Sequence, residues 1–514
     1  MNQIIQSYVD GKQFMGAVLV AQGDQIILDN GYGYANLEWQ IADAPDARFR
    51  LGSITKQFTA AAILLLEERG KLSTNDPVKK YMPDAPAAWE KVTIYNLLTH
   101  TSGIPSFTDL PDYRSTEATP TTPEKLVARF RDKPLEFQPG EKWKYSNSGY
   151  VLLGYLLEKI SGQSYQDFIQ QNIFKPLGMT DSGYDSNSAI ILHRAYGYSP
   201  GPNGPVNAGY IDMTIPFSAG ALYSTTHDLL RWEEGLFGGK VLSAASLKKM
   251  TTPFKENYAC GLFVRTVNGH QLIEHGGGIE GFNTDLAYYP DDKLTVVVLG
   301  NLNGGAPNDI ASKLAAAVHG EKIVLPSERK EITVPAAVLS SYAGTYELAP
   351  GFSIAITLEN GQLMEQATNQ PKFPIFAESP TRFFLKVVDA QIEFVKNDKG
   401  EVNQMILHQG GRDMKGVRKL ASERKEITVP PAVLSSYAGT YELAPGFSIA
   451  ITLENGQLME QATNQPKFPL FAESPTRFFL KVVDAQIEFI KNDKGEVNAL
   501  VLHQNGRDIK GVRK

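Results

Sequence analysis

The chain has 514 residues, a formal net charge of −6 and 42% hydrophobic residues, a composition typical of an ordinary globular protein. At this length we expect about three domains. The acidic balance offers no basic face for nucleic acid, and no apolar run reaches the roughly 18 residues that a membrane-spanning helix needs.

The N-terminal segment Met1–Ser7 lacks the basic start and the apolar core of a signal peptide. We therefore expect a soluble protein, either cytoplasmic as the chain stands or exported after loss of a leader. The single cysteine, Cys260, excludes an internal disulfide. The eight histidines are scattered and form no metal-ligand pattern, so we expect neither a metal nor a cofactor.

The first predicted element is a β-hairpin formed by residues 16–22 and 25–34. We expect its strands to join later strands around residues 260–300 in one sheet. The intervening region, about residues 55–220, reads as a mostly helical lobe. This segregation of helices and strands predicts an α+β fold, an antiparallel sheet flanked by helices plus the helical lobe.

A long apolar helix is predicted from Ile54 to Arg69, with Gly70 as its stop. Ser53 lies at its N-terminus, where free backbone N–H groups and the helix dipole favour developing negative charge. Lys56 follows three residues later and so lies on the same face as the Ser53 hydroxyl. Ser-x-x-Lys alone is a weak signal, because it recurs at residues 246–249, 327–330 and 422–425.

The next candidate segment is a loop, punctuated by Pro139 and Gly140, that leads into a predicted helix at residues 151–160. Tyr145 and Asn147 lie two residues apart in this loop and can point into one cleft. A tyrosine phenol relays a proton if nearby cations lower its pKa, and an asparagine amide holds an ester or amide group. The alternative is a half-buried aromatic residue beside a helix cap.

Further along, His275 precedes a run of glycines that includes Gly277 and Gly278. Strands are predicted on the far side of this run, at residues 282–289 and 294–299. Glycines beside a reacting serine allow close approach of a substrate and offer N–H groups for an oxyanion hole. The alternative is a glycine-rich hairpin corner with a surface histidine.

These three motifs occur in the order found in the serine β-lactamase-like family, and residues 10–320 resemble its class C, penicillin-binding-protein, family VIII carboxylesterase and D-peptidase members. Three further segments add to the resemblance: residues 94–105 (IYNLLTHTSGIP), 176–182 (PLGMTDS) and 218–229 (SAGALYSTTHDL).

The resemblance implies a role for each matching residue. Ser53 would be the acyl-accepting nucleophile, with Lys56 as its proton acceptor. Tyr145 would be a second general acid/base, and which of Lys56 and Tyr145 is the operating base stays open. Asn147 would contact the acyl side of the substrate.

The backbone N–H groups of Ser53 and Gly278, beside Gly277, would form the oxyanion hole. His275 stands where many relatives carry the lysine of Lys-Thr-Gly, and a mostly neutral histidine offers less to a substrate carboxylate. The resemblance therefore favours ester or D-residue peptide hydrolysis over efficient β-lactam hydrolysis. A Ser-His-Asp arrangement is an alternative, but the chain has no Gly-x-Ser-x-Gly elbow, and His100 reads as a structural loop residue.

The C-terminal part of the chain is a tandem repeat. Residues 327–419 and 422–514 align without gaps and differ at eight positions, mostly by swaps between apolar residues. The copies must therefore share a fold. Alternating apolar residues at 352–358, the Asn360-Gly361 turn and further strands at 382–388, 391–396 and 402–408 predict a small antiparallel β-barrel.

Each copy is similar to the lipocalin-like domains that accompany some β-lactamase-like peptidases and esterases. We expect three domains: residues 1–325, a first barrel at 326–420 and a second at 421–514, with the charged segments near 326–330 and 420–425 as linkers. The barrels would narrow the cleft, mediate homo-oligomerisation, or have no site of their own.

The sequence thus predicts a serine hydrolase that acts on small ester, peptide or β-lactam-like substrates through an acyl-enzyme. A carboxylesterase or a D-residue peptidase or amidase is the leading interpretation. The alternative is a penicillin-binding or sensing protein of the same fold with slow or no turnover, or a weak β-lactamase.

Overall fold

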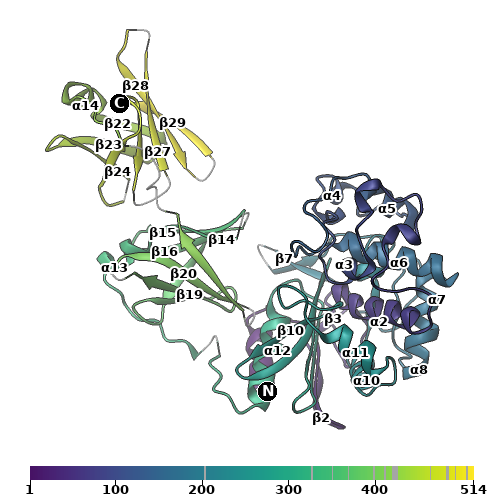
Figure 1. Cartoon of the computed structure of the whole chain (residues 1–514). Helices are drawn as coiled ribbons and strands as arrows, with labels where there is room; N and C mark the ends of the chain where they lie inside the picture. Colours follow the sequence, from purple (N-terminus) through teal and green to yellow (C-terminus); the bar gives the residue numbers. More distant parts are fainter. Residues whose placement is uncertain are drawn as a thin grey trace. The chain divides into compact units, whose positions relative to one another are not determined.

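The chain, described here from a computed structural model, forms two compact units, Met1–Leu325 and Pro326–Lys514 (Figure 1). The structure describes all residues except 202–203, 326–327, 350, 369, 398–399, 410–411, 420–425, 464, 482–484, 493 and 505–506. Both predicted linkers, the Ser-x-x-Lys patterns at 327–330 and 422–425, and the centre of the turn at 397–400 fall wholly or partly outside these residues. Within the described ranges, no helix has the length and apolar character needed to cross a bilayer.

The first unit is built on a six-stranded antiparallel sheet in the order β10-β11-β12-β13-β1-β2. The strands are β1 (Gly16–Gln22), β2 (Gln25–Tyr32), β10 (Phe263–Val267), β11 (His270–Ile279), β12 (Phe282–Tyr289) and β13 (Leu294–Gly300). The N-terminal hairpin pairs with β13 along the full length of β1. The predicted joining of both chain regions in one sheet is confirmed.

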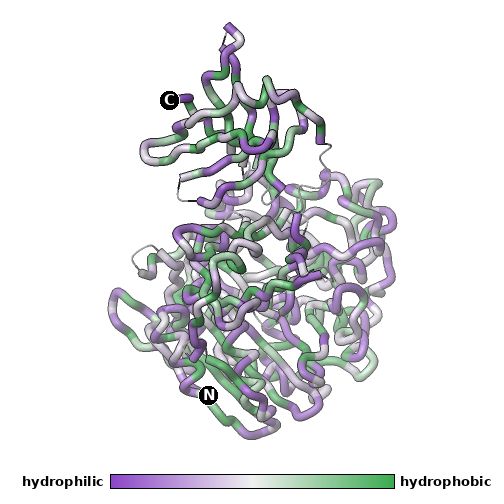
Figure 2. The backbone as a smooth tube through the Cα atoms, turned by 90° about the vertical axis from the view of Figure 1, so that its left-hand side faces the viewer, coloured by the Kyte–Doolittle hydropathy of each residue, from purple (hydrophilic) through white to green (hydrophobic). Residues whose placement is uncertain are grey.

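The sheet is buried on both faces because alternate side chains of its central strands enter two different cores. Val296 and Val298 of β13 pack with α1 (Asn2–Asp10) and α12 (Ala306–Val318). Val297 and Leu299 belong to the larger core that contains the helical lobe. Figure 2 shows the resulting continuous apolar segments beside the N-terminus. Since both faces are covered, these strands read as apolar runs.

The helical lobe is organised around two long apolar helices, α2 (Thr55–Glu68) and α6 (Asn147–Ser161). Twelve consecutive residues of α2, Thr55 to Leu66, are buried. Its polar Thr59 is held inside by hydrogen bonds of 2.7 Å with the Tyr165 hydroxyl and the Ser218 carbonyl. This lobe and the sheet together confirm the predicted α+β class.

The other helices and turns of the first unit are η1 (Gly52–Ile54), η2 (Val78–Lys80), η3 (Ala87–Trp89), α3 (Ile94–Leu98), η4 (Phe107–Asp109), α4 (Tyr113–Thr116), α5 (Pro123–Arg131), α7 (Tyr165–Ile169), η5 (Gln170–Phe174), α8 (Lys175–Leu177), α9 (Phe217–Gly220), α10 (Thr226–Phe237) and α11 (Ala244–Thr251). The short strands are β3 (Tyr34–Asn36), β4 (Ile41–Ala42), β5 (Phe49–Arg50), β6 (Gly183–Tyr184), β7 (Tyr198–Gly201), β8 (Gly204–Asn207) and β9 (Leu222–Ser224).

The second unit contains two closed eight-stranded antiparallel barrels, so the prediction of two tandem barrels is confirmed. The first comprises α13 (Ala336–Tyr342), β14 (Gly344–Ala349), β15 (Phe352–Glu359), β16 (Gln362–Ala367), β17 (Phe373–Ala377), β18 (Arg382–Leu385), β19 (Ala390–Lys396), β20 (Val402–Gln409) and β21 (Arg412–Arg418). The second comprises α14 (Pro431–Tyr437), β22 (Gly439–Ala444), β23 (Phe447–Glu454), β24 (Gln457–Ala462), β25 (Phe468–Ala472), β26 (Arg477–Leu480), β27 (Ala485–Lys491), β28 (Val497–Gln504) and β29 (Arg507–Arg513).

A glutamate of each barrel is buried among apolar side chains, Glu365 of β16 and Glu460 of β24. Glu365 lies opposite Ile356 and Phe373, and both glutamates are 6% exposed. Desolvation raises the pKa of each carboxyl group to about 7. Because the folded state binds this proton more tightly than the unfolded chain, the contribution of each carboxyl group to barrel stability is fully present below pH 4.5 and is lost as the pH rises through about 7.

We therefore expect the double variant Glu365→Gln/Glu460→Gln to be more stable than the parent at pH 8, by about 1–3 kcal/mol per barrel, and nearly equal to it at pH 5. All four tryptophans lie in the first unit. Calorimetry should thus show the gain while tryptophan fluorescence stays unchanged. If the variant and the parent differed in free energy of unfolding by the same amount at both pH values, the raised pKa of the two glutamates would be contradicted.

Candidate active site

Ser53 lies in η1, a single turn that connects β5 to α2. The turn begins at Gly52, whose φ of +54° is in the left-handed region. A Cβ atom placed on Gly52 would lie 2.8 Å from the backbone nitrogen of Gly278. The turn therefore needs glycine on both grounds, and it brings the helix start against strand β11.

Lys56 occupies the first turn of α2 and is completely buried. Its Nζ lies 2.9 Å from the Ser53 Oγ, 2.9 Å from the Asn147 Oδ1 and 2.8 Å from the carbonyl oxygen of Ala219. Burial lowers the pKa of Lys56 well below its ordinary value. A neutral amine has two N–H bonds for the two carbonyl-type oxygens, so its lone pair faces the serine hydroxyl.

Asn147 is the first residue of α6, four residues before the predicted start of that helix. Its backbone N–H donates to the Ser106 hydroxyl at 3.0 Å, and its Nδ2 donates to the Thr108 hydroxyl at 3.1 Å. Because the Oδ1 of Asn147 also accepts a hydrogen bond from Lys56, both polar atoms of the amide have protein partners. Asn147 therefore fixes the lysine while one side of it lines the cavity.

Tyr145 completes the cluster, because its hydroxyl donates to the Ser53 Oγ at 2.8 Å. The Lys56 Nζ lies 4.8 Å from the centre of its ring. Burial raises the pKa of this phenol above its ordinary value, so the condition that nearby cations lower it is not met here. The tyrosine is a neutral proton donor in the resting site.

The glycine run is part of strand β11, and the hairpin turns later, at Glu280 and Gly281. A Cβ atom on Gly277 would lie 1.9 Å from the carbonyl oxygen of Leu51, which also accepts a hydrogen bond of 2.8 Å from the Thr284 hydroxyl. The glycines thus let the strand pass directly against the turn that carries Ser53. Ser53 and Gly278 both line the same cavity, as an oxyanion hole requires.

His275 is 3% exposed, so the surface-histidine alternative is wrong. Its Nε2 lies 3.2 Å from the Tyr258 hydroxyl and its Nδ1 lies 2.6 Å from the Gly276 carbonyl oxygen. The His275 and Tyr145 ring centres are 6.3 Å apart. His275 therefore supports the aromatic wall behind Tyr145 and is absent from the described lining of the cavity.

His100, which the sequence presented as a loop residue, lies directly behind Tyr145, with ring centres 4.3 Å apart. Its Nδ1 accepts the backbone N–H of Ser146 at 3.2 Å, and its buried Nε2 has no hydrogen-bond partner among the described residues. Burial lowers the pKa of His100 well below its ordinary value. The backbone φ of His100 is +56°, in the left-handed region that few non-glycine residues adopt. No sequence pattern predicts this backbone conformation.

The cavity in front of Ser53 has a volume of about 620 Å³. It includes Phe107 and Ile211 as apolar lining residues. The charged lining residues are Arg114, Glu117 and Glu280. The Arg114 Nη1 lies 2.9 Å from Glu280 and 3.1 Å from Glu117, so the guanidinium already has two carboxylate partners. Since no histidine hydrogen-bonds Ser53 within the described structure, the geometry gives no support to a Ser-His-Asp arrangement.

Comparison with known proteins places this site in a family. The family model "Beta-lactamase" matches residues 1–321, and the model "Domain of unknown function (DUF3471)" matches residues 328–418 and 423–513. The chain is 30% identical to "Penicillin-binding protein 4*" of Bacillus subtilis over 445 residues, which cover 81% of this chain and 98% of that protein.

Two solved structures are also similar. The octameric penicillin-binding protein homologue from Pyrococcus abyssi is 26% identical with a TM-score of 0.59, covering 81% of this chain and 98% of the other. The D-stereospecific amidohydrolase from Streptomyces sp. is 25% identical with a TM-score of 0.52, covering 60% of this chain and 94% of the other.

Replacing Lys56 tests whether burial disfavours the protonated form of its amine. We expect Lys56→Met to lower kcat by about 10²–10⁴ and to raise the melting temperature at pH 7. Because the folded pKa is depressed, unfolding takes up a proton between that pKa and the ordinary value of 10.5, so the parent loses stability as the pH falls through this window. The exposed Lys248 provides the matched control, since Lys248→Met should change neither quantity.

His100 should act through Tyr145. We expect His100→Ala to lower kcat roughly 10–100-fold with little change in KM, because a displaced tyrosine no longer meets the serine oxygen. Kinetics of His193→Ala, a change at an exposed histidine paired with Asp46, give the control. An unchanged kcat for His100→Ala in a folded protein would remove this positioning role.

Proposed function

The chain belongs to the Beta-lactamase family, and from this we propose that it is a serine hydrolase, a carboxylesterase or a peptidase or amidase for D-residue peptides. The observation that carries the proposal is the meeting of Lys56 and Tyr145 at one oxygen, the Ser53 Oγ, at 2.9 and 2.8 Å. That oxygen opens onto a cavity of about 620 Å³, which suits a small substrate.

Acylation begins when the neutral amine of Lys56 takes the Ser53 hydroxyl proton and the Oγ attacks the substrate carbonyl carbon. The backbone N–H groups of Ser53 and Gly278 bind the resulting oxyanion. The Tyr145 phenol gives its proton to the leaving oxygen or nitrogen, and the proton on Lys56 then restores the phenol. The step ends with an acyl ester on Ser53, a neutral amine on Lys56 and a neutral phenol on Tyr145, and the former hydroxyl proton of Ser53 has left with the leaving group.

Deacylation uses water as the second nucleophile. The water gives a proton to the Lys56–Tyr145 pair and attacks the ester carbon, and the same N–H groups bind the second oxyanion. When the C–Oγ bond breaks, the Ser53 oxygen regains a proton from the pair. The product is a carboxylic acid, and no metal or cofactor takes part in these steps.

The charges of the cavity favour neutral or cationic substrates over carboxylates. Arg114 is the cation of the described lining, and Glu117 and Glu280 already neutralise it. His275 has hydrogen-bond partners in the protein wall. A β-lactam carboxylate would therefore meet net negative charge at this end of the cavity, which supports ester or amide hydrolysis over β-lactam hydrolysis.

The second candidate is a penicillin-binding or sensing protein that is acylated and released slowly, which the name of the Bacillus subtilis relative favours. The Pyrococcus abyssi homologue is octameric, and this motivates the proposal that the present chain forms a homo-oligomer through its barrels. The proposal of a homo-oligomer is tested by comparing the molecular mass in solution of the full chain with that of a version that ends at residue 325.

Initial hydrolysis rates on a short-chain nitrophenyl ester, a D-phenylalanine anilide and a chromogenic cephalosporin test the proposal. We expect turnover of the ester or the anilide, slow turnover of the cephalosporin, and a loss of at least about 10³-fold in Ser53→Ala. A stable covalent adduct without turnover of any probe would favour the binding protein instead. Full activity in Ser53→Ala would refute the site.

A further inference from the structure

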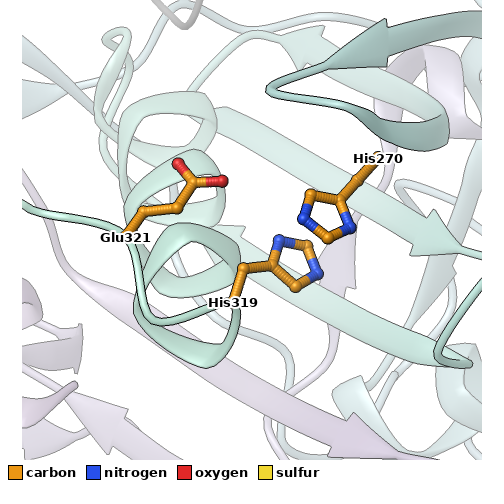
Figure 3. A group of neighbouring side chains, drawn as sticks. All are labelled: His270, His319 and Glu321. Carbon is orange, nitrogen blue, oxygen red and sulfur yellow. The ribbon is translucent and has the colours of Figure 1, made fainter.

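A second group of chemically active side chains lies on the first unit outside the cavity. His270 is the first residue of β11, His319 is the C-cap of α12, and Glu321 follows two residues later. Figure 3 shows the Glu321 carboxylate directed toward the two imidazole rings. No sequence pattern predicts this group, because its two histidines are 49 residues apart in the chain.

The donor atoms of this group are close together. One ligand atom from each of the three residues lies within 4.8 Å of the others. The two rings are stacked, with centres 3.7 Å apart and planes 6° from parallel. His270 and Glu321 are half-buried and let solvent reach the group, whereas the side chain of His319 is only 5% exposed and is held at the end of the helix.

Asp292 orients one of the two histidines. Its Oδ2 lies 3.1 Å from the His319 Nε2, and its Oδ1 is buried without a hydrogen-bond partner among the described residues. With the proton of a neutral His319 on Nε2, the lone pair is on Nδ1. A carboxylate that accepts the second N–H of a histidine is the usual outer partner of a metal-binding imidazole.

We propose that His270, His319 and Glu321 form a binding site for a divalent transition metal ion of the Zn²⁺ class, with solvent as the remaining ligand. Two imidazole nitrogens and one carboxylate oxygen suit Zn²⁺ and its spectroscopic substitute Co²⁺, whereas Mg²⁺ and Ca²⁺ prefer oxygen ligands alone. Nothing in the Lys56–Ser53–Tyr145 chemistry requires this ion.

Binding must open the ring stack. In-plane lone pairs of two parallel rings cannot converge on one ion, so at least one imidazole turns about its side-chain bonds. His270 follows the Asn268-Gly269 turn and is only half-buried, which leaves its ring room to turn. Glu321 has its Oε2 2.5 Å from the Asn268 Nδ2, so the other carboxylate oxygen is the one offered to the ion.

The ion would link the beginning of β11 to the end of α12. The same strand carries Gly278 near its other end, so the link adds to the rigidity of the sheet that supports the proposed oxyanion wall. The predicted effect is on stability, because a ligand that binds only the folded state raises its melting temperature.

Calorimetric titration of the full, chelator-treated chain with Zn²⁺, and visible absorption on adding Co²⁺, test the site. We expect one ion per chain with micromolar or tighter affinity, tetrahedral Co²⁺ bands, and a melting temperature a few degrees higher with Zn²⁺. His319→Ala and Glu321→Gln should each weaken binding at least about tenfold.

Matched controls distinguish this site from other histidines. His193→Ala removes a histidine that pairs with Asp46, and His408→Ala removes one that contacts Glu393, Asp413 and Arg382; both variants should bind Zn²⁺ like the parent. If no ion binds, or if His319→Ala binds as tightly as His193→Ala, the proposal is wrong. Because Glu321→Gln keeps the size of the side chain, its loss of binding cannot be ascribed to misfolding when its zinc-free melting temperature matches the parent's.

Discussion

The active site depends on one buried amine. Lys56 has two oxygen acceptors that can only accept hydrogen bonds, Asn147 Oδ1 and the Ala219 carbonyl, and one hydroxyl neighbour, Ser53. Burial disfavours its protonation, and the geometry then aims the lone pair at the serine. The apolar helix that buries Lys56 is therefore part of the proposed chemistry as well as part of the core. The packing of α2 and α6 offsets the unfavourable free energy of burying an amine.

The second constraint is the close approach of two backbones. Gly52 and Gly277 each occupy a position where a Cβ atom would collide with the opposite segment, so the turn before α2 and strand β11 touch along their main chains. This contact sets Ser53 beside Gly278, so the two proposed oxyanion donors lie on two different elements. The sheet is buried on both faces, which keeps β11 fixed while the helical lobe supplies Lys56, Tyr145 and Asn147.

Much of the fold and of the candidate site could be predicted from the sequence, because these segments have strong local patterns. The apolar run after Ser53, the alternating strands of the barrels and the N-terminal hairpin all formed as their patterns indicated. The failures concern burial and long-range packing. The alternative of a hairpin corner at the glycine run arose because glycine disfavours strands, whereas close packing against Leu51 selects glycine within the strand here. Neither the raised pKa of Tyr145 nor the place of His100 has a sequence signal, since both follow from rings brought together by tertiary structure.

The central claim is that Ser53 is the nucleophile and that neutral Lys56 activates it. Labelling of the full chain with an uncharged phosphonate ester, followed by mass spectrometry across a range of pH, tests this claim most directly. The account predicts one adduct per chain on the Ser53 peptide, a rate that rises with pH through a pKa well below 10.5, and slow labelling in Lys56→Met. An adduct on another residue, or a labelling rate that ignores both the pH and Lys56, would contradict it.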